Sequence, residues 1–218
     1  MRRGIFITLE GPEGAGKSTQ GRQLSSWLRR RGYKVLFTRE PGGTVLGQRL
    51  RQIVLDRRHG KMNPLVELFL YEASRATIVS EVIRPALKSG RIVVVDRFQD
   101  STWVYQGWAG GLPLKLVEQM GQAATGGLKP DLTLLLDLPV KKGLARVKRP
   151  NRMEAKPVAF HEKVRAGYRL LARREPRRFR LIQADQPTEK VQQQIQKIVS
   201  QIPFMVRQAH HERHRRVN

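Results

Sequence analysis

Gly11-Pro12-Glu13-Gly14-Ala15-Gly16-Lys17-Ser18 is the stretch that decides the fold of this 218-residue chain. It fits the pattern G-x-x-x-x-G-K-[ST], a glycine-rich loop whose backbone N–H groups close around a triphosphate. In such a loop, Lys17 reaches the outer phosphates and the hydroxyl of Ser18 binds Mg²⁺. A chance glycine turn is the alternative, and the flanking sequence decides between the two.

The flanking sequence supplies the strand and the helix that a phosphate loop requires. Residues 5–9 form a short, mostly apolar run with β-branched residues, typical of a buried parallel strand. After the loop, Leu24, Trp27 and Leu28 fall at helical spacing, and Gly32 stands where a helix ends. The N-terminus of that helix directs unpaired N–H groups at the phosphates, so a phosphate-binding loop is favoured.

Composition predicts one domain built around one core. The chain is 39% hydrophobic and has no apolar run of 18 residues, so no membrane span is expected. Met1-Arg2-Arg3-Gly4 leads directly into the first strand, which leaves no room for a signal peptide. The absence of cysteine excludes disulfides, thiol catalysis and cysteine-ligated zinc, and it suits a cytoplasmic location.

The chain is strongly basic, with 42 Lys and Arg against 18 Asp and Glu and a net charge of +24. Residues 141–180 hold fifteen basic and three acidic residues, which is half of the excess. Such a bias fits polyanionic partners, either nucleic acid or clustered phosphates, and a solvated basic surface is the alternative. Because Phe160 and Tyr168 follow core periodicity, no stacking platform for bases is evident, and no stable nucleic-acid partner is expected.

Apolar runs alternate with helical patterns along the chain. The runs are residues 5–9, 35–37, 92–95 and 132–136, with a weaker one at 181–182. This rhythm predicts an α/β fold with three layers, in which helices cover both faces of a five-stranded parallel sheet. Ligands are then expected at the carboxyl ends of the strands.

Two of the predicted strands lead into charged segments at that edge. The second strand enters Thr38-Arg39-Glu40-Pro41-Gly42-Gly43-Thr44, where Pro41 fixes the turn and can carry a cis bond, and the guanidinium of Arg39 can bind a second anion. The third delivers Asp96-Arg97-Phe98, where Asp96 can hold Mg²⁺ through water and Arg97 can grip a phosphate. A plain surface turn and an isolated ion pair are the respective alternatives.

Two further segments carry candidate base-recognition residues. A helix is predicted from Asn63-Pro64 to about Lys88, with Pro85 bending its last turn or ending it early. Tyr71 and Arg75 share one face of it and could hold a flat heterocycle, although such a pair is more often core edge plus surface charge. Thr102 and Gln106 could read base edges, or could equally be cap and turn residues. The apolar stripe of the helix is predicted to comprise Leu65, Leu68, Ala76, Ile83 and Leu87.

The basic segment near residues 146–156 is predicted to be a short lid over the phosphates. Arg146, Arg149 and Arg152 could neutralise charge on the transferring phosphoryl group. One P-loop domain is expected over residues 1–203, followed by a basic, disordered tail at 204–218. The tail contains three histidines for which a metal site is the alternative, and no function is assigned to it.

Together these motifs resemble the thymidylate kinase family of P-loop nucleoside monophosphate kinases, from about residue 5 to about residue 202. The resemblance rests on residues 9–18, 38–44, 96–98 and 101–107, on Pro130-Asp131-Leu132-Thr133 and on Phe160-His161. It implies a P-loop NTPase fold and transfer of the γ-phosphoryl group of ATP to dTMP with Mg²⁺. Relatives of this kind are homodimers.

The resemblance also implies roles for individual residues. Glu13 would contact the sugar 3′-hydroxyl of the acceptor, and Tyr71 would stack on thymine. The ATP-binding set is Gly11, Glu13, Gly14, Ala15, Gly16, Lys17, Ser18 and Thr19. The dTMP-binding set is Glu13, Arg39, Tyr71, Arg75, Arg97, Thr102 and Gln106. The catalytic set is Lys17, Arg97, Arg146, Arg149 and Arg152, and the metal set is Ser18 and Asp96.

The sequence departs from the family pattern in the lid and in two other places. Arg149-Pro150-Asn151-Arg152 replaces a longer arginine-rich turn, so the pattern leaves open which lid arginine meets the γ-phosphate. Gly110 stands in place of an arginine, and Phe98 in place of a tyrosine or histidine. Two other functions stay open at this point: a basic P-loop ATPase that binds nucleic acid, and a kinase for another nucleoside monophosphate.

Overall fold

Five strands form one parallel sheet in the order β2-β3-β1-β4-β5. The structure is a computed structural model, and it describes residues 4–202. The strands are β1 (Ile5–Glu10), β2 (Val35–Arg39), β3 (Ile92–Asp96), β4 (Leu132–Asp137) and β5 (Phe179–Gln183). The sheet confirms the predicted fold class. Four strands run further than their apolar runs because polar residues at the carboxyl end still join the ladder, and β5 extends beyond its run at both ends.

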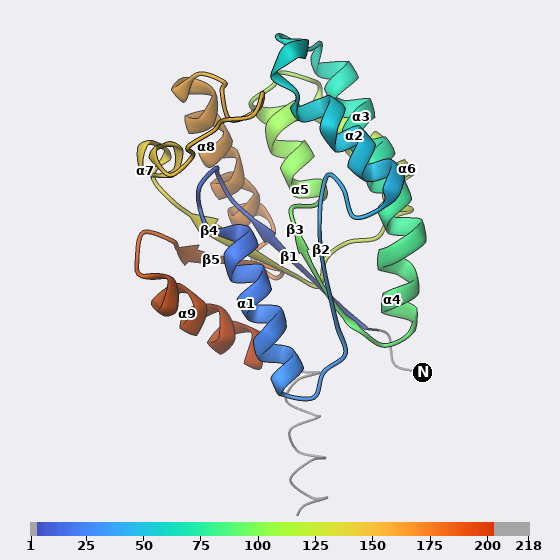
Figure 1. Cartoon of the computed structure of the whole chain (residues 1–218), viewed down its shortest axis with the longest axis vertical. Coiled ribbons are helices and arrows are strands. Elements are labelled where there is room, and N and C mark those ends of the chain that lie inside the picture. Colours follow the sequence, from blue (N-terminus) through green and yellow to red (C-terminus); the bar gives the residue numbers. More distant parts are fainter. Residues whose placement is uncertain (1–3, 203–218) are drawn as a thin grey trace, which may run out of the picture.

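Alternate residues of the strands feed two separate core layers. On one face, Ile5, Ile7 and Leu9 pack with α1 (Lys17–Arg30) and α9 (Thr188–Ser200). On the other face, Phe6 packs with the helix that begins at Pro64, and Leu135 packs with α8 (Val158–Arg174). Figure 1 shows α1 and α9 on one side of the sheet and the remaining long helices on the other. Burial on both faces explains the nearly continuous apolar runs in the sequence.

The remaining helical segments complete the outer layers and the loops above the sheet. The α-helices are α2 (Val45–Leu55), α3 (Pro64–Ile78), α4 (Arg84–Lys88), α5 (Gln99–Thr102), α6 (Leu114–Thr125) and α7 (Val140–Ala145). A 3₁₀ turn spans Arg57–His59, and π-helical turns span Val79–Ile83 and Trp103–Trp108.

The long helix predicted from residue 63 to residue 88 is present, but it is not uniform. Asn63 caps it by accepting a hydrogen bond from the backbone N–H of Leu65 at 2.8 Å. The π-helical turn Val79–Ile83 joins α3 to α4, so Pro85 does not end the helix early. Because proline has no N–H to donate, a wider turn just before it accommodates the missing hydrogen bond. The placement of Leu65 in the buried stripe was wrong, since 37% of that residue is exposed.

Some predictions concern parts of the chain that the structure does not describe. The tail at residues 204–218, with its three histidines, lies outside the described residues. Within residues 4–202, no helix combines the length and the apolar character that crossing a membrane requires. The lid segment between α7 and α8 consists of turns with no long helix of its own.

Candidate functional site

The glycine-rich loop takes a shape that only glycine permits at two of its positions. Gly14 and Gly16 have φ angles of 68° and 89°, in the left-handed region. A Cβ at Gly14 would lie 2.1 Å from the carbonyl oxygen of Gly143 in α7, so the loop and α7 meet backbone to backbone. Gly16 is the N-cap of α1 and offers no side chain to its first N–H groups. Those N–H groups are therefore free to bind an anion.

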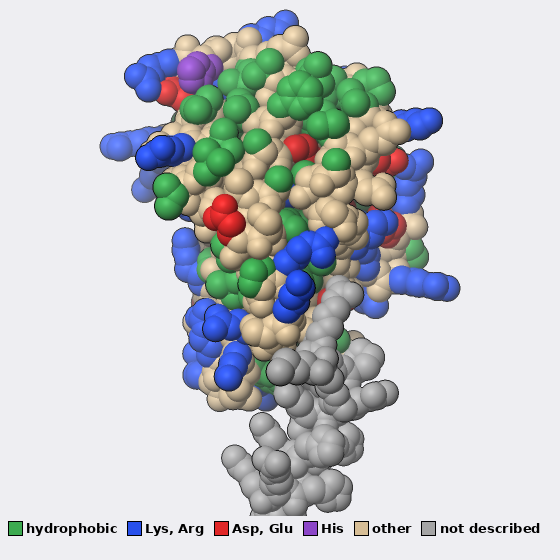
Figure 2. Space-filling view, turned by 90° about the vertical axis from the view of Figure 1, so that its right-hand side faces the viewer, with side chains coloured by type: hydrophobic (Ala, Val, Ile, Leu, Met, Phe, Trp, Pro, Cys, Tyr) green, Lys and Arg blue, Asp and Glu red, His purple; other side chains and the backbone are tan. Residues whose placement is uncertain are grey.

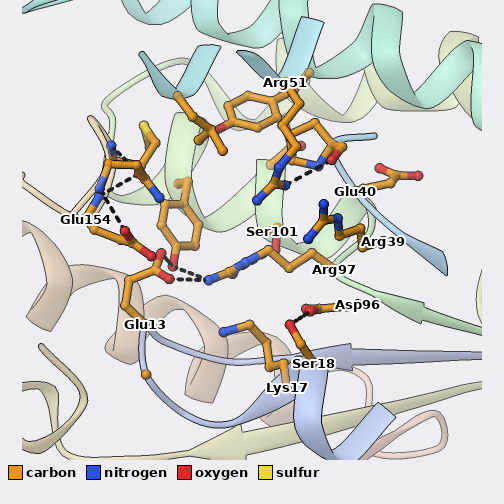
Figure 3. A pocket seen from close by; sticks show the side chains of 18 of the residues that line it. Glu13, Lys17, Ser18, Arg39, Glu40, Arg51, Asp96, Arg97, Ser101 and Glu154 are labelled. Carbon is orange, nitrogen blue, oxygen red and sulfur yellow. Dashed lines mark hydrogen bonds and ion pairs between the residues drawn. The ribbon is translucent and has the colours of Figure 1, made fainter. Parts of the chain in front are cut away.

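Lys17 lies beneath this loop and is 7% exposed. Its Nζ donates hydrogen bonds to the carbonyl oxygens of Gly11 at 3.1 Å and Pro12 at 2.7 Å. Burial and the nearby charge of Arg97 lower the pKa of Lys17 to about 8. The ammonium group thus points into the region where the loop would hold phosphates (Figure 3).

Ser18 and Asp96 meet at the edge of the sheet, as the sequence predicted. The Ser18 hydroxyl donates to a carboxylate oxygen of Asp96 at the end of β3. These are hard oxygen ligands of the kind that Mg²⁺ prefers. Among residues 4–202 there is no cluster of three or more histidine, aspartate or glutamate side chains that could hold a metal alone. The pair fits a magnesium ion whose other ligands are phosphates and waters.

Arg97 lies directly beyond this pair and connects several elements. Its backbone is left-handed, with φ at 70°, which is uncommon for a residue other than glycine. Its guanidinium donates to Glu13 at 2.9 Å and to the hydroxyls of Tyr105 and Tyr168, each at 3.1 Å. Although burial opposes it, the charges of Arg97 and Lys17 lower the pKa of Glu13 to about 2. Glu13 is therefore ionised at neutral pH and holds Arg97 at the rim.

Glu10 supports this arrangement from inside the protein. It is fully buried and accepts hydrogen bonds from the backbone N–H of Phe98 and from the hydroxyls of Ser101 and Tyr168. Burial and the charge of Asp100 raise the pKa of Glu10 to about 7. Nothing in the local sequence indicates this role for Glu10, because its three donors come from distant parts of the chain.

A second cationic region lies across from the phosphate loop. Figure 3 shows Arg39, at the end of β2, and Arg51, from α2, on the same side of the pocket as Arg97. Arg51 donates to the carbonyl oxygen of Pro41 at 3.0 Å, and the Glu40–Pro41 peptide bond is cis. Burial and the charge of Arg39 lower the pKa of Arg51. Sequence reasoning missed Arg51, because nothing in the local sequence of α2 shows which of its residues faces the pocket.

Tyr71 and Arg75 both line the pocket from α3. Arg75 is 1% exposed, so the alternative that it is a surface charge is wrong. Its guanidinium contacts Glu40 at 2.7 Å, Glu72 at 2.8 Å and the side-chain oxygen of Gln99 at 2.7 Å. The charge of Arg75 is thus balanced by buried carboxylates, and its side chain still lines the pocket.

Thr102 and Gln106 are also buried and line the pocket. They come from α5 and the π-helical turn that follows it. Thr102 makes no side-chain cap hydrogen bond, so the alternative role of a cap is not realised there. The Gln106 amide donates to Glu67 at 3.0 Å. Together, α5 and this π-helical turn place the side chains of Thr102 and Gln106 at the same cavity.

The three lid arginines occupy different environments. Arg146 lines the pocket and donates to the carbonyl oxygen of Gly14 at 3.2 Å. Arg149 is exposed and does not line it. Arg152 is buried; it contacts Glu67 at 2.6 Å and donates to the carbonyl oxygen of Val54 at 2.9 Å. The structure therefore brings Arg146 to the phosphate loop but not Arg149 or Arg152, because Arg152 is bound to α2 and α3 instead.

The phosphate loop, the rim residues Asp96 and Arg97, the base-recognition candidates and Arg146 line one cavity of about 410 Å³. The cavity contains the phosphate loop at one end and the side chains of Tyr71, Thr102 and Gln106 at the other, with three arginines between them. This volume lies within the range of about 300–1,000 Å³ that is typical of small-ligand sites.

Comparison with known proteins identifies close similarities. The model of the family described as thymidylate kinase matches residues 9–195. The thymidylate kinase of Desulfovibrio desulfuricans is 52% identical over 197 residues, covering 86% of this chain and 91% of that protein. The thymidylate kinase of Deinococcus radiodurans is 48% identical over 204 residues, covering 92% and 98%. A crystal structure of thymidylate kinase from Ehrlichia chaffeensis superposes with a TM-score of 0.75 at 29% identity, covering 91% and 99%.

Proposed function

The chain belongs to the thymidylate kinase family, and on this premise we propose that it transfers the γ-phosphoryl group of ATP to dTMP, giving dTDP. One observation carries the proposal beyond family membership. A triphosphate loop and a separate group of arginines open into the same cavity, so two phosphorylated ligands can lie end to end. A nucleotide hydrolase needs only the first of these features.

On the donor side, the residues from Gly11 to Thr19 hold the phosphates of ATP. Lys17 exchanges its contacts with the two loop carbonyls for contacts with the outer phosphate oxygens. Ser18 and Asp96 would hold Mg²⁺, which would neutralise charge on the phosphates. Phosphoryl transfer needs little covalent chemistry from the protein, so alignment and positive charge are its main contributions.

On the acceptor side, Arg39, Arg51 and Arg97 surround the phosphate of dTMP. Tyr71 stacks on the base, and Arg75, Thr102 and Gln106 contact its edge. Glu13 lies between the two phosphate regions and is placed to contact the sugar. These assignments follow from the lining of the cavity and from the family pattern.

Arg146 is the lid arginine that we assign to the transferring group. Its hydrogen bond to the carbonyl oxygen of Gly14 places its guanidinium beside the loop. An arginine there can neutralise charge on the equatorial oxygens as it develops. Arg149 and Arg152 belonged to the predicted catalytic set, and their positions in the structure give no support for that role.

We further propose that two copies associate through α2 and α3. Six large apolar side chains are exposed there: Val45, Leu46, Ile53, Leu65, Val66 and Phe69. Figure 2 shows hydrophobic side chains gathered toward one end of this face. A contiguous exposed apolar area of this kind is typical of an interface. Sedimentation velocity of the wild type and Phe69→Glu tests this; a monomeric wild type contradicts it.

Three further expectations remain predictions. They are a single catalytic domain over residues 1–203 with its lid near 146–156, a cytoplasmic location, and the lack of a stable nucleic-acid partner. The basic segment at residues 141–180 has local uses that make such a partner unnecessary, since Arg165 pairs with Asp137 at 2.7 Å and Arg178 pairs with Asp100 at 2.7 Å.

The decisive experiment measures ADP formed from ATP with a panel of nucleoside monophosphates. A dTMP kinase forms ADP only when an acceptor is present, and dTMP gives the highest kcat/KM. A basic ATPase that binds nucleic acid responds instead to polynucleotide, and a kinase for another acceptor prefers that acceptor. Folded protein that ignores dTMP would overturn the proposal.

A further inference from the structure

Glu67 is a buried carboxylate that accepts hydrogen bonds from three different residues. It lies in the first turn of α3 and is 2% exposed. One carboxylate oxygen, Oε1, accepts from Arg152 at 2.6 Å, and the other, Oε2, accepts from the amide of Gln106 at 3.0 Å. Lys156 contacts both oxygens, at 3.2 and 3.3 Å. Two lid cations and one base-pocket residue thus meet at one buried carboxylate.

The ionised carboxylate fixes which end of the Gln106 amide faces it. A carboxylate can only accept hydrogen bonds, so the NH₂ group of Gln106 must face Glu67. The carbonyl oxygen of that amide is then directed away from Glu67. Because Gln106 lines the acceptor cavity, the atom left for a ligand there is an acceptor.

An acceptor at this position distinguishes between pyrimidines. Thymine and uracil carry an N–H at ring position 3 and can donate to a carbonyl oxygen. Cytosine has an unprotonated nitrogen there, so two acceptors would face each other. A buried polar group left without a partner is unfavourable enough to set a preference of about tenfold between the two bases.

The lid cations keep Glu67 ionised and in place. Although burial opposes it, the hydrogen bond from Arg152 and the charge of Lys156 lower the pKa of Glu67. Arg152 is itself held by α2, because its backbone N–H donates to the carbonyl oxygen of Leu55 at 3.0 Å and its side chain donates to that of Val54. The carboxylate therefore has one fixed orientation, with Oε2 toward Gln106.

We infer that Glu67 is a positioning residue that sets the base preference of the acceptor pocket by fixing the orientation of the Gln106 amide. The inference rests on the proposed function, because it concerns the acceptor of that reaction. It assigns Arg152 and Lys156, which do not act on the phosphates, to holding this carboxylate. A purely structural ion pair would affect stability and leave the preference unchanged.

Glu67→Gln tests the inference with almost no change in shape. Arg152 and Lys156 still require an acceptor, so the new amide directs its oxygen to them and its NH₂ group to Gln106. The Gln106 amide then turns over and presents NH₂ to the base. The ratio of kcat/KM for dTMP to that for dCMP should fall at least about tenfold, mainly through KM. An unchanged ratio in a folded variant overturns the inference.

Two further variants separate the amide from the lid. Arg152→Met removes one of the two cations that hold Glu67 but leaves the carboxylate and Lys156, so the ratio should fall less than in Glu67→Gln. A fall as large as that of Glu67→Gln would show that the arginine, and not the orientation of the Gln106 amide, sets the preference and would overturn the inference. The double variant Glu67→Gln, Gln106→Glu returns an acceptor to the pocket. It should therefore restore the preference for dTMP over dCMP. This result remains decisive if Glu67→Gln alone does not fold.

The wild type in the same assay keeps the two proposals distinguishable. If the wild type does not phosphorylate dTMP, the proposed function itself fails. If the wild type prefers dTMP and Glu67→Gln keeps the same preference, only the inference about Glu67 fails. Thermal melts of all variants monitor folding independently of activity.

Discussion

The two ends of the cavity are built in different ways. The donor end is a continuous backbone segment, in which glycine conformations and helix N–H groups form the binding surface. The acceptor end is assembled from side chains on β2, α2, α3 and the π-helical turn, and buried ion pairs hold it together. The comparison shows that a local motif specifies the first, whereas only the tertiary fold specifies the second.

The largest effect is expected from Lys17→Ala at the donor end. Loss of the ammonium group removes charge neutralisation at the outer phosphates, so kcat should fall by about 10⁴-fold. Single-turnover measurements with saturating ATP and dTMP check this. Unchanged circular dichroism is the control for folding, and a variant that retains most of its activity would contradict a role for the loop in phosphoryl transfer.

Arg75→Met should show how strongly the acceptor end depends on its buried ion pairs. Removing the cation leaves Glu40 and Glu72 without their partner in a buried site. The free energy of unfolding should fall by about 3 kcal/mol. Denaturant titration measures this, with Arg58→Met as the matched control, because the Arg58–Asp56 pair is exposed and its loss should leave the midpoint unchanged. Equal effects of the two variants would show that buried ion pairs do not hold the acceptor end together.

Arg146→Ala should slow phosphoryl transfer by about 10²-fold, since this arginine lies beside the loop. Arg149→Ala is the control, because Arg149 belongs to the same segment but lies outside the cavity, and its kcat should stay near that of the wild type. Rapid-quench kinetics distinguish the chemical step from product release. The reverse ranking would show that the lid adopts another arrangement during turnover.

The fold was predictable because its signals are local. The five apolar runs, the loop and the rim residues Asp96 and Arg97 were all placed correctly from sequence. The roles of Arg51, Glu67 and Arg152 were not predictable, because each depends on partners far along the chain. Arg152 shows the difficulty most clearly: an arginine in a basic segment was expected at the phosphates, yet Glu67, 85 positions earlier, binds it inside the protein.

Tyr71→Ala should have a smaller effect, confined to the acceptor end. Loss of the aromatic ring removes stacking on the base, worth about 1 kcal/mol, so KM for dTMP should rise about fivefold. KM for ATP should not change, because Tyr71 lies away from the loop. Steady-state kinetics with each substrate varied in turn check both statements, and an unchanged KM for dTMP would contradict the stacking role.

The smallest expected effect is a fraction of a proton taken up with ATP. Lys17 has a lowered pKa of about 8 in the free protein, and phosphate oxygens raise it on binding. At about pH 8.5 much of Lys17 is uncharged before binding, so ATP binding should take up protons; at about pH 6.5 it should not. Calorimetry in buffers of different ionisation enthalpy measures the uptake. Lys17→Ala should abolish it, and persistence of the uptake would assign it to another group.

The backbone contact between Gly14 and Gly143 has a consequence for how such sequences can diverge. Neither position accepts a side chain unless the opposing chain moves away, since a Cβ at Gly143 would lie 2.2 Å from the carbonyl oxygen of Glu13. In relatives, substitution at one of these glycines should therefore be accompanied by a change at the other or by a displaced α7. Because Arg146 is the C-cap of that helix, such paired changes would also move the lid arginine, so replacements in the loop and the position of this arginine should covary in evolution.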